Sequence, residues 1–144
     1  MSFDRAHAYD VTLDWEEDHH GLLSAGDRVP IVAGPPSDFG GKDTWWSPEH
    51  MLLAAVSSCL MTTFLAIAAR EKLQLGAYRA VAHATVEKAA TGLVLSSIRV
   101  DVHLKTEAHE ATRAVSVMEK AKRHCIVGNA LKPAIEVRLD VTAS

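Results

Sequence analysis

The chain has 144 residues, of which 48% are hydrophobic and 23% are charged, so it is long enough for a globular domain with its own core. Its formal net charge of −3 gives no basis for binding nucleic acid or an anionic membrane, and we expect neither partner. Residues 1–7 lack the apolar run of a secretion signal, so we expect a cytoplasmic protein with reduced thiols. We expect a single domain over residues 1–144.

Three short strands are predicted in the first part of the chain. Residues 9–15 alternate between polar and apolar side chains, which is typical of a strand. A turn with a short second strand fits residues 20–26, and residues 28–33 are a third candidate. Pro30 lacks a backbone donor and therefore favours an edge position for that third strand. The Gly- and Pro-rich residues 34–41 indicate a loop.

A long helix is predicted from Ser47 to about Leu75. Ser47 suits the N-cap, and Pro48 suits the first helical position, where its missing N–H costs nothing. Glu49 falls in the first turn, where the helix dipole favours a carboxylate. Gly76 is expected to end the helix.

The centre of this helix, residues 51–69, carries no charge and is nearly long enough to cross a bilayer. Four serine and threonine side chains interrupt the run, and the predicted strands need a helix to cover them. We therefore interpret it as the buried central helix of a domain and not as a membrane span.

Two long strands with alternating side chains are predicted after the helix. Residues 78–86 and 98–105 form these strands, and Thr91 with Gly92 marks the hairpin turn between them. The inward face of the second strand is expected to carry Ile98, Val100, Val102 and Leu104. That of the first is expected to carry Tyr78, Ala80, Ala82, Ala84 and Val86.

A second helix and a last strand complete the predicted order. Thr106 is expected to cap a helix that runs to about His124, and Gly128 with Asn129 is expected to break it before a strand over residues 135–141. The apolar seam of this helix is predicted to be Ala108, Ala111, Ala114, Val115, Met118 and Ala121. The whole order predicts an α+β domain in which helices pack on antiparallel sheets.

The two cysteines of the chain lie in different settings. Cys59 is in the middle of the uncharged helix, where its ordinary role is that of a small buried hydrophobe. Cys125 follows a basic stretch, residues 120–124, and continues the apolar seam of the second helix, where nearby positive charge favours a thiolate. A distant pair of cysteines in a cytoplasmic chain indicates redox chemistry more than a structural disulfide. If both helices pack on one sheet, the two sulfur atoms can approach each other.

Other candidate residues have both an ordinary and a functional interpretation. Glu49 lies ten residues before Cys59, and it either complements the helix dipole or orients a cationic group toward the thiol. Trp45 and Trp46 are either core anchors or, with Phe39, an aromatic wall for an apolar substrate. The chain has eight histidines but no short-range pair with metal-ligand spacing, so we expect no metal and no cofactor.

Two segments of the chain resemble motifs of a known family. They are Phe39-Gly-Gly…Trp46-Ser-Pro-Glu-His-Met-Leu-Leu-Ala-Ala-Val-Ser-Ser-Cys59 and Ala121-Lys-Arg-His-Cys125-Ile-Val-Gly-Asn-Ala-Leu131. They resemble the two cysteine regions of the OsmC/Ohr family, the osmotically induced and organic-hydroperoxide-resistance proteins. The resemblance implies an α+β fold that forms an intertwined homodimer. It also implies a thiol peroxidase that reduces organic hydroperoxides without a cofactor.

The resemblance further implies a role for each site residue. Cys59 corresponds to the peroxidatic thiolate and Cys125 to the resolving thiol, with which it forms a disulfide that an external dithiol reduces. Glu49 corresponds to the carboxylate that holds a catalytic arginine over Cys59. That arginine usually lies in the turn after the first strand, and residues 15–21 of this chain contain none.

Three residues are candidate substitutes for the missing arginine. His19 lies closest to the expected position, His20 follows it, and Arg28 is the nearest arginine downstream. A protonated histidine in this role would make activity depend on pH. Two alternatives to a peroxidase remain. One is a ligand-binding or redox-sensing protein of the same fold, and the other is a zinc site built from the cysteines and a histidine.

Overall fold

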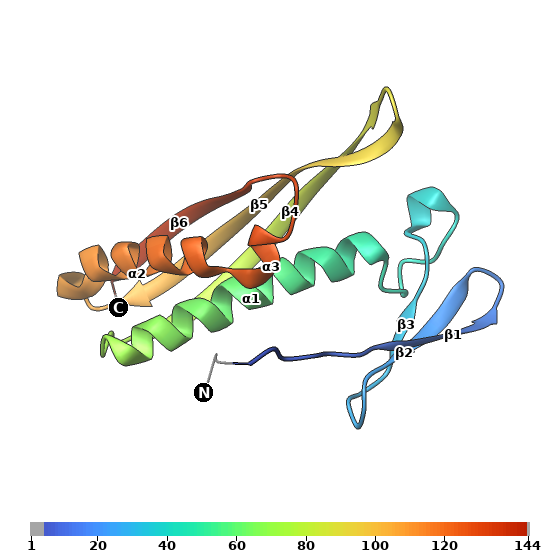
Figure 1. Cartoon of the computed structure of the whole chain (residues 1–144). Helices are drawn as coiled ribbons and strands as arrows, with labels where there is room; N and C mark the ends of the chain where they lie inside the picture. Colours follow the sequence, from blue (N-terminus) through green and yellow to red (C-terminus); the bar gives the residue numbers. More distant parts are fainter. Residues whose placement is uncertain (1–4, 144) are drawn as a thin grey trace. The chain divides into compact units, whose positions relative to one another are not determined.

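The computed structural model describes residues 5–143, and the chain divides into two compact units, residues 1–51 and 52–144 (Figure 1). The boundary between them falls within helix α1 (Pro48–Arg70). The single domain over residues 1–144 stays a prediction, and its two ends, residues 1–4 and residue 144, lie outside the described residues.

The first unit is built on a three-stranded antiparallel sheet in the order β1-β2-β3. Its strands are β1 (Thr12–Glu17), β2 (His20–Ser24) and β3 (Ile31–Ala33). The three predicted strands are confirmed, and β3 lies at an edge as Pro30 indicated. β1 begins at Thr12 and not at residue 9. Thr12 pairs with Ser24, the last residue of β2, and the chain turns after Ser24, so residues 9–11 have no strand to pair with. A short 3₁₀ turn, η1 (Ser37–Phe39), lies in the predicted loop.

Ser47 caps the N-terminus of α1 as predicted. The backbone N–H of His50 donates to Ser47 Oγ at 3.1 Å, and Ser47 Oγ lies 2.6 Å from His50 Nδ1. The Ser47 side chain is fully buried, and the cap satisfies one of the N–H groups that have no partner within the helix.

The C-terminus of α1 differs from the prediction. The helix ends at Arg70 and not near Leu75, because Lys72 takes a left-handed conformation with φ of 56°. The N–H groups of Lys72 and Leu73 donate to the carbonyls of Ala69 and Ala68, which is the hydrogen-bond pattern of a left-handed helix stop. Glycine usually occupies that position, so a lysine gives no sequence signal for it.

The second unit contains a sheet in the order β4-β5-β6. Strands β4 (Ala77–Ala89) and β5 (Gly92–Thr106) form the predicted antiparallel hairpin. The prediction of antiparallel sheets is wrong for β6 (Ile135–Ala143), which pairs with β5 in parallel. The helix α2 (Ala111–His124) crosses between β5 and β6, and such a crossover returns the chain in the same direction.

One face of this sheet carries the core of the second unit, and α1 and α2 lie along it (Figure 1). The predicted inward residues of β5, Ile98 to Leu104 in alternation, are buried. Four of the five predicted residues of β4 pack against the core, but Val86 is 40% exposed. A bulge at this point leaves Ser96 of β5 unpaired, and Val86 lies in the outer part of the hairpin, where residues 85–93 are all exposed.

Helix α2 begins later than predicted. A 3₁₀ turn, η2 (Ala108–Glu110), follows β5, and α2 starts at Ala111 instead of directly after Thr106. Glu110 is buried and bonds to Arg113 at 2.8 Å, which holds this turn in place.

The predicted seam of α2 is correct in part. Val115 is 47% exposed and Ala108 lies in the preceding turn, whereas Val117 is fully buried. The buried seam is Ala114, Val117, Met118 and Ala121, and Cys125 continues it as predicted. The helix breaks at Cys125, whose backbone is extended, and Gly128 and Asn129 lie in the short helix α3 (Ile126–Asn129) beyond the break.

Within the single chain, α1 buries only one stripe of its surface. The stripe is formed by Val56, Leu60, Phe64, Ile67 and Ala68. α1 is long and apolar enough to cross a membrane by length and composition, and only 28% of its most apolar window is buried. The prediction that this helix is buried is therefore correct for that stripe only, and the other faces of α1 are not buried within the described part of the chain.

Candidate functional site

The second unit brings the two cysteines together. Cys59 lies in the middle of α1 and is half-buried, and Cys125 lies at the end of α2 and is only 5% exposed. Cys125 belongs to the buried core, Cys59 packs against the same core, and both are free thiols. The fold thus places both cysteines on one core, and Cys59 is near enough to Cys125 to affect its pKa.

The Cys125 thiol is held in its protonated form. Burial raises its pKa above the ordinary value, and the neighbouring Cys59 thiol raises it further. Backbone N–H groups of Gly128 and Val127 act in the opposite direction. The basic residues that precede Cys125 in sequence, Lys122 and Arg123 among them, are exposed and do not dominate its titration. A protonated Cys125 can donate a hydrogen bond to the Cys59 sulfur.

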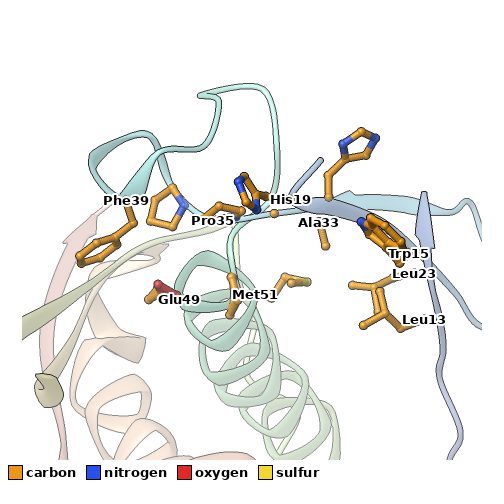
Figure 2. Close-up of a pocket in the computed structure, with 14 residues that line it drawn as sticks. Leu13, Trp15, His19, Leu23, Ala33, Pro35, Phe39, Glu49 and Met51 are labelled. Atoms are coloured by element: carbon orange, nitrogen blue, oxygen red, sulfur yellow. The ribbon is translucent and has the colours of Figure 1, made fainter. Parts of the chain in front are cut away.

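The first unit contains an open cavity of about 680 Å³, here called the hairpin cavity. It is lined by residues of the β1–β2 hairpin, the loop after β3 and the first turn of α1. Figure 2 shows Leu13, Trp15 and Leu23 gathered on one side of it and Phe39 with Glu49 on the other. Its walls are mainly apolar, so it suits an apolar or aromatic ligand.

Two candidate substitutes for the missing arginine line the hairpin cavity. His19 lies in the turn between β1 and β2, and His20 begins β2. The His20 ring lies 4.9 Å from the ring of Trp45, and its Nδ1 atom is buried without a hydrogen-bond partner among the described residues. A buried ring nitrogen without a partner is costly, which makes this atom a candidate contact for a ligand.

Arg28, the third candidate, lies away from this cavity. It is exposed in the turn between β2 and β3, and its Nη1 donates to the Ala25 carbonyl at 3.2 Å. It is not among the residues that line the hairpin cavity. The described structure of the first unit therefore favours the histidines over Arg28.

The predicted aromatic wall is only partly in the cavity. Phe39 lines it and is 52% exposed. Trp45 instead packs on Gly34, where an added Cβ would lie 2.5 Å from its ring, and Trp46 pairs with Ala33. Both tryptophans line a separate hollow of about 190 Å³ beside His50.

Glu49 lies in the first turn of α1 as predicted, and it lines the hairpin cavity. No basic side chain within residues 5–143 lies at ion-pair distance from its carboxylate. A cationic partner for Glu49 is thus not supplied by the described part of a single chain.

Sequence reasoning did not identify most of the cavity wall. Leu13 and Trp15 point the same way from β1, and Met51 closes the wall from α1. The spacing of Leu13 and Trp15 along one strand was a usable signal, because alternate residues share a face. Pro35 and Pro36 carried no such signal, since their position depends on how the loop after β3 folds.

Among residues 5–143 no group of three His, Cys, Asp or Glu side chains is arranged to hold a metal ion. The zinc alternative therefore has no ligand set in the described part of the chain.

Known structures share this fold. An OsmC-like protein of unknown function from Vibrio cholerae is 15% identical, with a TM-score of 0.83 over 94% of this chain and 100% of that one. An organic hydroperoxide resistance protein from Elizabethkingia anophelis is 20% identical, with a TM-score of 0.72 over 97% and 100% of the two chains. An OsmC-like protein from Mycoplasma pneumoniae is 16% identical, with a TM-score of 0.78 over 96% and 99%. These similarities define the fold as an OsmC-like α+β fold.

The sequence itself identifies the family. The family model described as OsmC-like protein matches residues 41–140, which include both cysteine regions. The chain belongs to the OsmC-like family. No curated protein matches it.

Proposed function

We propose that the protein is a thiol-dependent peroxidase that reduces organic hydroperoxides to alcohols. The observation that carries this proposal is the approach of Cys59 and Cys125 in the second unit, with one thiol half-buried and the other buried and protonated. Membership of the OsmC-like family and the similarity to organic hydroperoxide resistance proteins support it.

The proposed cycle uses the two thiols in sequence. The Cys59 thiolate attacks the terminal peroxide oxygen, the O–O bond breaks, and the alkoxide leaves and takes a proton to become an alcohol. Cys59 is left as a sulfenic acid. The Cys125 thiol then attacks that sulfur, water leaves, and a Cys59–Cys125 disulfide forms. An external dithiol reduces the disulfide, which requires a reducing compartment such as the cytoplasm.

In the first unit, the hairpin cavity is the proposed binding site for an apolar molecule. Its apolar walls suit an alkyl or aromatic hydroperoxide, and His19 and His20 are the proposed cationic groups in place of an arginine. The Glu49 carboxylate lines the same cavity, and among residues 5–143 neither histidine lies at ion-pair distance from it.

We also propose that the working form is a homodimer. α1 leaves most of its apolar surface uncovered, and the first unit exposes Leu13, Trp15 and Val29 by more than half. Apolar area on this scale is unusual on a monomer and indicates a protein partner. A second copy of the chain is the proposed cover.

Turnover with single-cysteine variants tests the proposed activity. The protein is supplied with cumene hydroperoxide and excess dithiothreitol, and the alcohol formed is measured. The Cys59→Ser variant is expected to lose turnover, because the remaining Cys125 thiol is buried and protonated. The Cys125→Ser variant is expected to complete one reduction and then to turn over slowly. Equal activity of Cys59→Ser and the parent would contradict the proposal.

A second candidate function is favoured by one observation. The hairpin cavity is mainly apolar, and no arginine of residues 5–143 lines it. These features also suit a protein that binds an apolar ligand and uses the cysteines only as a redox switch. Tight binding of a fatty acid to a variant without cysteines, combined with no alcohol production by the parent, would favour this function over the first.

A further inference from the structure

A second cavity, in the second unit, opens onto one cysteine of the pair and not onto the other. It has a volume of about 300 Å³ and lies between α1, the end of α2, α3 and the start of β6. We call it the Cys125 groove. Cys125 is among its lining residues and Cys59 is not. The two cysteines thus lie on one core, but a molecule in this groove meets Cys125 and not Cys59.

The chemistry of disulfide reduction gives this difference a consequence. An attacking thiolate approaches the disulfide along the S–S axis, from the side opposite the sulfur that leaves. A thiol in the Cys125 groove would therefore meet the Cys125 sulfur and expel the Cys59 sulfur. We propose that the Cys125 groove is the binding site of the external reductant, a slender thiol that carries a negative charge. This inference rests on the proposed peroxidase function.

The shape of the groove limits the size of the reductant. Cys125 is only 5% exposed, so a thiol on a bulky protein surface cannot reach its sulfur directly. Val56, Leu60 and Ile135 make the walls apolar, which suits an alkyl chain. A linear alkyl thiol is narrow enough to enter and present its sulfur to Cys125.

The charge of the reductant follows from the one basic side chain in the wall. Lys122 lines the groove and is exposed, and within residues 5–143 it has no acidic partner at ion-pair distance. Lys120, by contrast, lies 2.7 Å from Glu71 and is neutralised by it. Among residues 5–143, no acidic side chain lines the groove. An unpaired ammonium group beside an apolar channel favours a thiol with a carboxylate.

The complete step balances without a further reagent. The first thiolate forms a bond to the Cys125 sulfur, the Cys59–Cys125 bond breaks, and its electron pair leaves on the Cys59 sulfur. A second thiolate then attacks the reductant's sulfur and releases Cys125 as a thiolate. The two protein thiolates take the two protons that the reductant thiols gave up, and the reductant ends as its own disulfide.

The test starts from the disulfide form, prepared with diamide so that it does not depend on peroxidase activity. A limiting amount of mercaptopropionate is added, the free thiol is alkylated at once, and the mixed disulfide is located by peptide mass spectrometry. We expect the adduct on Cys125 and the alkyl group on Cys59. The reverse pattern would overturn the inference.

The rate at which different thiols reduce the Cys59–Cys125 disulfide tests whether the groove prefers an anionic reductant. Mercaptopropionate, mercaptoethanol and cysteamine are compared after correction for the thiolate fraction of each. We expect the anionic thiol to react about threefold faster than the neutral one and the cationic thiol to be slowest. The Lys122→Gln variant should remove this order. Lys132→Gln, a control at an exposed lysine outside the groove, should keep it.

The outcomes separate the inference from the proposed function. If neither diamide nor a hydroperoxide joins Cys59 to Cys125, the proposed function fails. If the disulfide forms but the adduct appears on Cys59, or if charge has no effect in the parent protein, only the inference fails.

Discussion

At the scale of single residues, burial decides which groups can hold a charge. Cys125 and Tyr78 lie in the same core, and burial raises the pKa of both. The pKa of Tyr78 is raised to about 12, with burial as the larger cause and the nearby Cys125 as the second. Both groups are therefore neutral donors at physiological pH. The Tyr78 hydroxyl is buried and has no hydrogen-bond partner among the described residues.

These two groups predict a loss of stability at high pH. A pKa that is higher in the folded state than in the unfolded state stabilises the fold below the unfolded value, and the effect is lost as pH rises. We expect the free energy of unfolding to fall above about pH 9, first through Cys125 and then through Tyr78. Urea titrations between neutral pH and pH 11 check this, and a constant value across that range would contradict it.

The Tyr78→Phe variant isolates the second group. It removes a buried hydroxyl without a partner while it keeps the ring that packs 5.5 Å from Phe64. At neutral pH we expect unchanged stability or a gain of up to about 1 kcal/mol. Above pH 10 the variant should lose stability less steeply than the parent. A loss of more than 1 kcal/mol at neutral pH would show that the hydroxyl has a partner in solution.

At the scale of elements, hydrogen bonds at the ends of helices decide where each one begins and stops. The Ser47→Ala variant removes the buried cap of α1 and is expected to lower the free energy of unfolding by about 1 to 2 kcal/mol. Ser58→Ala is the matched control, because Ser58 is exposed on the same helix and its hydroxyl donates only within the helix, to the carbonyls of Ala54 and Ala55. Equal losses in chemical denaturation would argue against the cap.

The corrected seam of α2 gives a second prediction at this scale. Val117→Ala should cost about 2 kcal/mol, because two methyl groups leave a fully buried site. Val115→Ala should cost less than about 0.5 kcal/mol, because Val115 is 47% exposed. The opposite order, measured by urea denaturation, would restore the seam that the sequence pattern suggested.

These elements show how much the sequence could predict. Alternation gave the β4–β5 hairpin and the buried face of β5, because side-chain period and burial coincide there. The parallel pairing of β6 and the bulge beside Val86 depend on contacts between distant segments, which no local pattern carries. The helix stop at Lys72 was missed because a lysine occupies a left-handed position.

The candidate site divides in the same way. The motifs identified Cys59, Cys125 and Glu49, because those residues lie in recognisable segments. The walls of the hairpin cavity come from β1, β2, a proline-rich loop and the start of α1, and among them only Phe39, Glu49 and the two histidines were predicted as site residues. Trp45 looked like part of the wall by its position in the sequence, but it packs on Gly34 instead.

At the scale of the whole molecule, the uncovered apolar surface predicts association. Sedimentation equilibrium is expected to give twice the 15.6 kDa mass of the chain. Leu65→Glu, on the 40% exposed side of α1, should shift the protein toward monomer. Val81→Glu is the control, since Val81 is equally exposed but lies on the outer face of β4 opposite Asp101. A monomeric parent protein would contradict the proposed dimer.

The proposal that Cys59 and Cys125 react in sequence with a hydroperoxide can be tested by a count of free thiols. Reduced protein is treated with one equivalent of cumene hydroperoxide near pH 7, and its thiols are counted over time beside the Cys59→Ser variant. We expect the parent to lose both thiols rapidly and its peptide map to link Cys59 to Cys125, whereas the single thiol of the variant should survive. Survival of both thiols in the parent after prolonged exposure would contradict the peroxidase function and leave ligand binding in the hairpin cavity as the better explanation.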